Sequence, residues 1–305
     1  MNKKYLRSFI SITIVAGLFL LGLFVSFRQS HKERSTVNAV LANYGLQETV
    51  DSENVLLVGK WQKYRSVQEA VDVAEEGAVI VVSPGVYRES VHASGKNLSI
   101  IGMDRNECVL TNPNGDYFFP PIEMGRGLLA NLTVHATAQQ MAQGAIAKAY
   151  AMHIDFDSSI NSNLDILDVN FINDDYQVLG IGLREGFTLR FSNCLFECRA
   201  DQNAFYCHDD PSREGSTRQK LIVENCHFVN SGKSKSTILM QSQESKGSEI
   251  SCQWISNTVE NKGDGQLFAV KHWTPQISTV GGWQGMSFWK NSEDSRGNSL
   301  QALNE

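Results

Sequence analysis

The 305-residue sequence predicts an all-β fold, a solenoid in which short strands stack coil on coil. Two runs of apolar and β-branched residues, 78–82 and 98–101, are each bounded by turn-forming Gly, Pro, Asn or Ser. Further along the chain, one short pattern recurs with no helical pattern between its copies. Short strands that meet at corners and repeat along the chain are typical of stacked β-coils.

The recurring pattern is a polar residue, a small residue, any residue and an apolar residue. We expect its apolar residues to form one buried column, and its polar residues, mostly asparagines, to form a ladder that binds backbone groups from coil to coil. The main copies are separated by 25, 32 and 31 residues. Their apolar positions are Phe171, Phe196, Phe228 and Val259, with weaker copies at Val134 and Ile100.

A helix is predicted over residues 66–76, just before the first complete coil. Ser66 and Glu69 form a Ser-x-x-Glu capping box, and Gly77 stops the helix. An open coil end would expose a strand edge, so we expect this helix to cap the solenoid. One helical face is apolar and carries Val67, Ala70, Val71 and Ala74.

The stretch that holds this helix and the first strands resembles the opening of the pectinesterase branch of the pectin-lyase-like superfamily. A capping helix, a Gly-x-Tyr-x-Glu segment (Gly85, Tyr87, Glu89) and a Lys-Asn-Leu strand beginning at Lys96 follow in the same order. The resemblance covers about residues 62–104 strongly and the later coils moderately. It implies a right-handed parallel β-helix, and it supports the fold better than any one reaction.

The second strand of each coil predicts a column of polar residues on one sheet. Met152, Cys207 and Met240 would face the core, so their neighbours would face outward. The expected outward column is His153, His208, Gln241 and His272.

The resemblance implies that this sheet carries a site made of a Gln, two Asp and an Arg. The matching positions of this sequence do not hold these residues. The Gln-Ala-Val strand falls near residues 150–152, and Gly180 stands where the acid/base Asp is expected. Asn203 or Ala204 stands where the nucleophilic Asp is expected, and no Gly-Arg-Pro-Trp segment occurs. We therefore do not expect the ordinary esterase machinery.

A different group of polar residues is the candidate site. His208, Asp209 and Asp210 are the candidate catalytic residues, because a histidine with paired carboxylates suits general acid/base chemistry. We expect no cofactor and no metal site, although the same carboxylates could bind a cation such as Ca²⁺. The alternative is that residues 209–211 form only a turn. The expected substrate-binding residues are His153, Tyr206, Gln241, Lys271, His272 and Trp273.

Three functions follow from these patterns. The first is an extracytoplasmic pectinesterase-like β-helix that binds or modifies a carbohydrate or cell-envelope polysaccharide. The second is an atypical carbohydrate esterase or polysaccharide lyase that uses the face around His208. The third is a structural surface protein without a ligand.

Charge and hydropathy suggest a membrane-attached protein that does not bind nucleic acid. Residues 51–305 hold 21 basic and 31 acidic residues, which disfavours nucleic acid as a partner. Residues 9–27 form a 19-residue run without a charge, long enough to span a bilayer, and no cleavage signal follows it. We expect an uncleaved single-pass anchor in the cell membrane, with the domain outside the cytoplasm.

These features divide the chain into five parts: a tail over 1–8, the anchor over 9–27, a linker over 28–54, the β-helix over 55–290 and a C-terminal tail over 291–305. The six cysteines lack the spacing of a metal site and are expected to be small buried residues.

Overall fold

In the computed structural model the chain forms a parallel β-helix, which confirms the predicted fold class. The structure describes residues 35–46, 52–112, 119–140, 146–147, 149–154, 162–183, 187–209, 217–241, 249–271 and 287–288. Contacts divide the chain into residues 1–49, in which residues 35–43 are helical, and residues 50–305, which hold the β-helix. The predicted right-handed sense stays a prediction, in line with the general preference of parallel crossovers.

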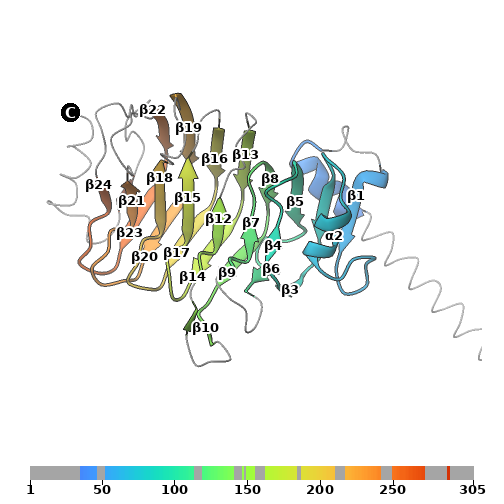
Figure 1. Ribbon diagram of the computed structural model, residues 1–305, viewed down its shortest axis with the longest axis horizontal. Coiled ribbons are helices and arrows are strands. Elements are labelled where there is room, and N and C mark those ends of the chain that lie inside the picture. Colours follow the sequence, from blue (N-terminus) through green and yellow to red (C-terminus); the bar gives the residue numbers. More distant parts are fainter. Residues whose placement is uncertain are drawn as a thin grey trace, which may run out of the picture. The chain divides into compact units, whose positions relative to one another are not determined.

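Each coil contributes one strand to each of three parallel sheets, which we call sheets A, B and C (Figure 1). Sheet A contains β1 (Val55–Val58), β2 (Val79–Val82), β5 (Leu98–Gly102), β8 (Gly127–Ala130), β13 (Ser162–Leu167), β16 (Phe187–Ser192), β19 (Thr217–Glu224) and β22 (Glu249–Ile255). Sheet B contains β3 (Gly85–Arg88), β6 (Cys108–Thr111), β9 (Thr133–Ala136), β14 (Asn170–Asn173), β17 (Leu195–Cys198), β20 (His227–Asn230), β23 (Thr258–Asn261) and β25 (Ser287–Phe288).

Sheet C contains β4 (Val91–His92), β7 (Ile122–Glu123), β12 (Met152–Ile154), β15 (Leu179–Leu183), β18 (Phe205–Asp209), β21 (Ile238–Gln241) and β24 (Phe268–Lys271). Three short elements lie outside the coils: the 3₁₀ helix η1 (Ser52–Asn54) and the antiparallel pair β10 (Gln139–Gln140) and β11 (Ile146–Ala147).

The predicted aromatic column exists. Phe171, Phe196 and Phe228 pair in successive strands of sheet B, and their rings stack at centroid distances of 5.5 and 4.7 Å. Val134 precedes Phe171 in the column as expected. The assignment of Ile100 to it was wrong, because Ile100 lies in sheet A, and Leu110 holds the position beside Val134. A strand-sized apolar run does not by itself tell which sheet of the coil it joins.

A left-handed residue makes the corner from sheet A to sheet B in the five coils from β8–β9 to β22–β23. The polar residue that opens the sequence repeat has φ between 53° and 59° in each copy, a conformation that Asn and Asp tolerate better than other side chains. The sequence repeat is therefore, in part, a repeat of backbone geometry. These corner residues are Asn131, Asp168, Asn193, Asn225 and Ser256.

Helix α2 (Val67–Val73) covers the first coil, as predicted, with the capping box of Ser66 and Glu69 in place. The predicted end at residue 76 was wrong, because the backbone is already extended at Ala74. The resemblance motif explains how the helix is held. The Glu89 carboxylate accepts hydrogen bonds from the Val67 and Gln68 N–H groups at 2.9 and 2.8 Å. At the other end, Lys96 Nζ donates to the carbonyls of residues 71, 72 and 74 at 2.7 to 3.1 Å. Both ends of the helix are thus closed by side chains from the coil beneath it.

Replacement of Lys96 by Ala should destabilise the domain by about 1–2 kcal/mol, because three carbonyls lose a charged donor. Urea unfolding followed by circular dichroism measures the change. Lys220→Ala is the matched control, since Lys220 is exposed on β19, and its midpoint should stay close to that of the parent. Equal midpoints for the two variants would contradict this role of Lys96.

Candidate functional site

The predicted outward residues of sheet C lie in two columns rather than one. His153 pairs with Gly180 on the next strand, whereas His208 pairs with Gly182, two residues further along β15. The single column predicted from the sequence was therefore wrong in register. Both histidines are half-buried and alternate with buried core residues, as the outward orientation requires.

His208 shares its column with Gln241 and Lys271. The backbone register pairs His208 with Gln241, and Gln241 with Lys271. Lys271 therefore holds the column position that the sequence analysis assigned to His272. Asp209 ends β18. The remaining predicted site residues lie outside the described residues: Asp210, His272 and Trp273.

The other column begins with three polar residues in register, His92, Glu123 and His153. Each Glu123 oxygen faces one imidazole: His92 Nδ1 lies at 2.8 Å and His153 Nδ1 at 3.5 Å. The hydrogen bond from His153, and then that from His92, hold the pKa of Glu123 below its ordinary value. This row is a carboxylate held in its charged form by two imidazoles.

Gly180, which stands at the expected acid/base position, is covered by an aromatic ring. A Cβ at Gly180 would lie 2.8 Å from the Tyr150 ring, so the glycine makes room for Tyr150 on the outer face of sheet C. The Tyr150 ring stacks on His153 at 5.8 Å and tilts against Tyr176 at 5.2 Å. Burial raises the pKa of Tyr150, with a smaller contribution from Tyr176, so its hydroxyl stays neutral and can donate a hydrogen bond.

Beside this ring, sheet C and the turns that lead into it form a pocket of about 610 Å³, within the usual range for a small-molecule site. Three tyrosines, Tyr150, Tyr176 and Tyr206, line it, and Tyr206 also contacts His208 at a ring distance of 5.6 Å. Apart from Leu239, the other lining residues are small or polar: Gln177, Gln202, Asn203, Ser234, Lys235, Ser236, Asp264, Gly265, Gln266 and Ala269.

Buried asparagines at the ends of the sheet B strands hold the turns that line the pocket. Asn173 accepts from the Tyr176 N–H at 2.9 Å and donates to the Gln177 carbonyl at 2.8 Å. Asn230 and Asn261 make the same kind of bonds two and three coils later, to residues 202, 232, 235, 236, 263 and 266. A ladder of buried asparagines therefore exists, but it lies two residues after the apolar residue of the repeat and not at the polar residue that opens it, where the sequence analysis placed it. Its amides hold the turns that line the pocket.

In one coil the ladder position holds a cysteine, and an asparagine elsewhere in the coil binds the turn instead. Cys198 stands between Asn173 and Asn230 in the register of sheet B. In that coil Asn203, in the turn before β18, donates to the Ser236 carbonyl at 2.7 Å. A buried side-chain amide therefore still binds this turn, although the residue at the ladder position is Cys198 and not asparagine.

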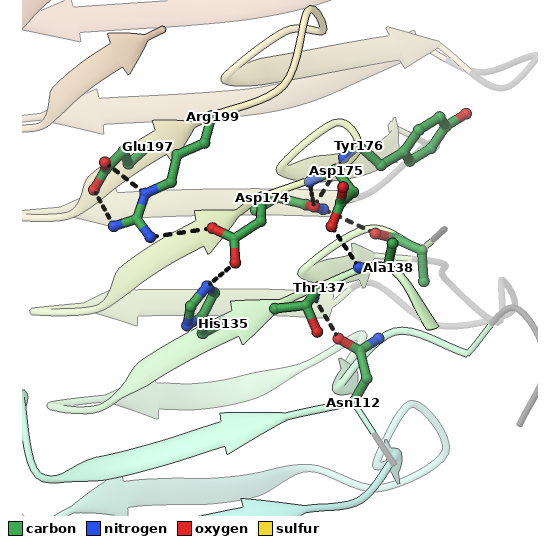
Figure 2. Close-up of polar contacts among 11 residues, drawn as sticks. Asn112, His135, Thr137, Ala138, Asp174, Asp175, Tyr176, Glu197 and Arg199 are labelled. Atoms are coloured by element: carbon green, nitrogen blue, oxygen red, sulfur yellow. Dashed lines mark hydrogen bonds and ion pairs between the residues drawn. The ribbon is translucent and has the colours of Figure 1, made fainter. Parts of the chain in front are cut away.

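A polar network on the outer face of sheet B ties the same turns together (Figure 2). Asp174 bonds His135 at 2.8 Å and Arg199 at 3.1 Å, and Arg199 also pairs with Glu197 at 2.8 Å. Asp175 accepts from the Ala138 N–H at 2.6 Å. Since residues 174 and 175 directly precede Tyr176, these bonds fix the approach of the chain to the pocket.

The sequence identified Tyr206 as a site residue but missed Tyr150, Tyr176 and the turn amides. The available signal was positional, because both missed tyrosines stand in the turn just before a sheet C strand. The cysteine prediction holds for the five described cysteine side chains, which are all buried. Among the described residues, no group of three potential ligands is arranged to hold a metal ion.

Comparison with solved structures finds pectin methylesterases. The deglycosylated enzyme from Aspergillus niger is 13% identical with a TM-score of 0.44, and the match covers 84% of this chain and 97% of that one. The carrot enzyme is 12% identical with a TM-score of 0.41 and the same coverage. A pectin methylesterase in complex with hexasaccharide VII is 11% identical with a TM-score of 0.45, covering 82% and 97%. No protein-family model and no curated protein matches the sequence.

Removal of the Glu123 charge should change the acid stability of the domain. Because the folded state lowers the pKa of Glu123 below its ordinary value of 4.5, the interaction stabilises the fold above about pH 4.5 and is lost as the pH falls through the lowered pKa. The unfolding free energy of the parent should thus exceed that of Glu123→Gln at neutral pH and approach it in acid.

Urea titrations at a series of pH values measure this difference. Glu53→Gln, which removes an exposed carboxylate, is the matched control and should follow the parent throughout. A parent advantage over Glu123→Gln that persists unchanged into strong acid would rule out the charged carboxylate as its source.

Proposed function

We propose that this protein binds a carbohydrate chain in the pocket of Tyr150, Tyr176 and Tyr206. The observation that carries the proposal is the combination of three tyrosines with side-chain amides in one pocket. Aromatic rings pack against the apolar faces of sugars, and amides donate and accept hydrogen bonds with hydroxyl groups. Turns held by buried asparagines present these groups in fixed positions, which lowers the entropic cost of binding.

Binding without turnover is the form of this function that the pocket supports best. Its described lining contains two charged side chains, Lys235 and Asp264, both exposed, and no histidine or glutamate. Tyr150 covers Gly180, so no space for a carboxylate is open at the position where the family resemblance would place one. The described lining thus holds one carboxylate, that of Asp264, and not the pair that the resemblance implies for ester hydrolysis.

Incubation of the full chain with methyl-esterified pectin and a panel of neutral and acidic oligosaccharides tests the proposal. Calorimetry should detect binding of at least one member, while assays for methanol, acetate and unsaturated ends stay at background. Release of any of these products would support the alternative, an atypical esterase or lyase. Absence of binding to every member of the panel would contradict the proposed carbohydrate binding and would favour a structural surface protein without a ligand.

Tyr206→Ala should weaken sugar binding by about tenfold, since loss of an aromatic contact costs on the order of 1 kcal/mol or more. Phe119→Ala is the matched control, because Phe119 is an exposed aromatic residue that does not line the pocket, and this variant should bind as the parent does.

The double variant His208→Ala, Asp209→Ala tests the face predicted from the sequence. If it alone abolishes binding, the ligand lies on the His208 column and the pocket assignment is wrong.

We further propose that residues 9–27 anchor the protein in the cell membrane with the β-helix outside the cytoplasm. The uncharged length of this run and the lack of a cleavage signal support the proposal. Among the described residues no helix is long and apolar enough to cross a bilayer, and residues 9–27 lie outside them.

Fractionation of cells that express the full chain tests the anchor. The protein should stay in the membrane pellet after washes with high salt and with alkaline carbonate, because a spanning helix is not released by either. Release by these washes, or a mature N-terminus found after residue 27, would contradict the anchor.

A further inference from the structure

An exposed aromatic and basic loop, residues 59–65, projects from the first coil of the β-helix. Trp61 at its tip is 77% exposed, more than any other large apolar side chain among the described residues. A single exposed apolar residue is common on protein surfaces, so Trp61 indicates a partner only together with the residues that surround it. The pocket does not include any residue of this loop, so carbohydrate binding there does not explain it.

The loop is closed at its base and presents its tip in a fixed position. The Gly59 N–H donates to the Tyr64 carbonyl at 2.9 Å, and the Gln62 N–H donates to the Gly59 carbonyl at 3.1 Å. Tyr64 packs against the hydrophobic core. Gly59 is needed for the close approach to the next coil, because a Cβ there would lie 2.9 Å from Ser83. Trp61 is therefore held in its exposed position by a loop with a defined conformation.

The loop is basic on a domain that is otherwise acidic. It carries Lys60, Lys63 and Arg65 and no acidic residue, whereas residues 51–305 hold ten more acidic than basic residues. All three basic side chains are exposed, and none forms an ion pair with another described residue. The closest acidic residue in the sequence, Glu69, is engaged in the capping box, where it accepts from the Arg65 and Ser66 N–H groups.

From this geometry we propose that loop 59–65 docks onto an anionic bilayer surface. Trp and Tyr suit the headgroup region because each has an apolar body and a polar tip, and adjacent Lys and Arg are attracted to anionic lipid. Lys60 Nζ lies over the Trp61 ring, 5.0 Å from its centre, so the charge and the aromatic ring are presented together. The uncharged run that ends at residue 27 precedes the loop by about thirty residues, so the loop belongs to the coil nearest the proposed anchor along the chain.

Lipid quenching of tryptophan fluorescence tests the docking in the full chain, and the difference between the parent and Trp61→Phe isolates Trp61 from the other four tryptophans. The protein is reconstituted into phosphatidylcholine vesicles with and without phosphatidylglycerol, using lipids brominated near the headgroup to quench tryptophan. The parent is compared with Trp61→Phe and with the matched variant Trp61→Phe, Ile255→Trp. Ile255 is also an exposed apolar residue, but it ends β22 at the opposite end of sheet A from β1 (Figure 1).

We expect anionic vesicles to quench the parent, and both Trp61→Phe and the Ile255→Trp reporter to lose most of that quenching. Lys60→Glu with Lys63→Glu should also lose it, while an unchanged circular dichroism spectrum shows that the coil is folded. Equal quenching of the two reporters, or quenching independent of phosphatidylglycerol, would overturn the proposal. A change in Trp61 emission on addition of a panel oligosaccharide, without lipid quenching, would assign the loop to the carbohydrate instead.

Discussion

The buried asparagine amides at the ends of the sheet B strands are the interaction on which the rest of the site depends. A coil must turn sharply between sheets B and C, and the turn leaves carbonyl and N–H groups without strand partners. Asn173, Asn230 and Asn261 supply both a donor and an acceptor at these points and are at most 1% exposed. An unpaired buried polar group costs on the order of 1–3 kcal/mol, so these amides fix the path of each turn.

The pocket follows from that path and from one missing side chain. The held turns place Tyr176, Gln177 and Gln202 at the edge of sheet C. Gly180 leaves the space that the Tyr150 ring occupies, and the ring in turn contacts His153. A position that offers chemistry in the family that the sequence resembles thus becomes a packing surface for an aromatic ring. This exchange is the reason that we propose binding rather than catalysis.

The sequence predicted most of the fold, because the fold depends on short-range signals. The capping box of Ser66, the period of the Phe196 column and the turn residues each act within a few residues or repeat at a fixed interval. The site was predicted less well. The register of His208 against His153 depends on where each strand begins after turns of different length, and no local pattern fixes that. Tyr150 acts across a coil on Gly180, a contact that a single sequence does not reveal.

The most direct test of this account is a crystal structure of the full chain with an oligosaccharide that binds it in the panel. We predict sugar rings packed against Tyr150 and Tyr206, with hydroxyl groups bonded to the side-chain amides of Gln177 and Gln202, and the buried asparagine amides unchanged. A sugar bound along the His92, Glu123 and His153 row or over sheet B, with the tyrosine pocket empty, would contradict it.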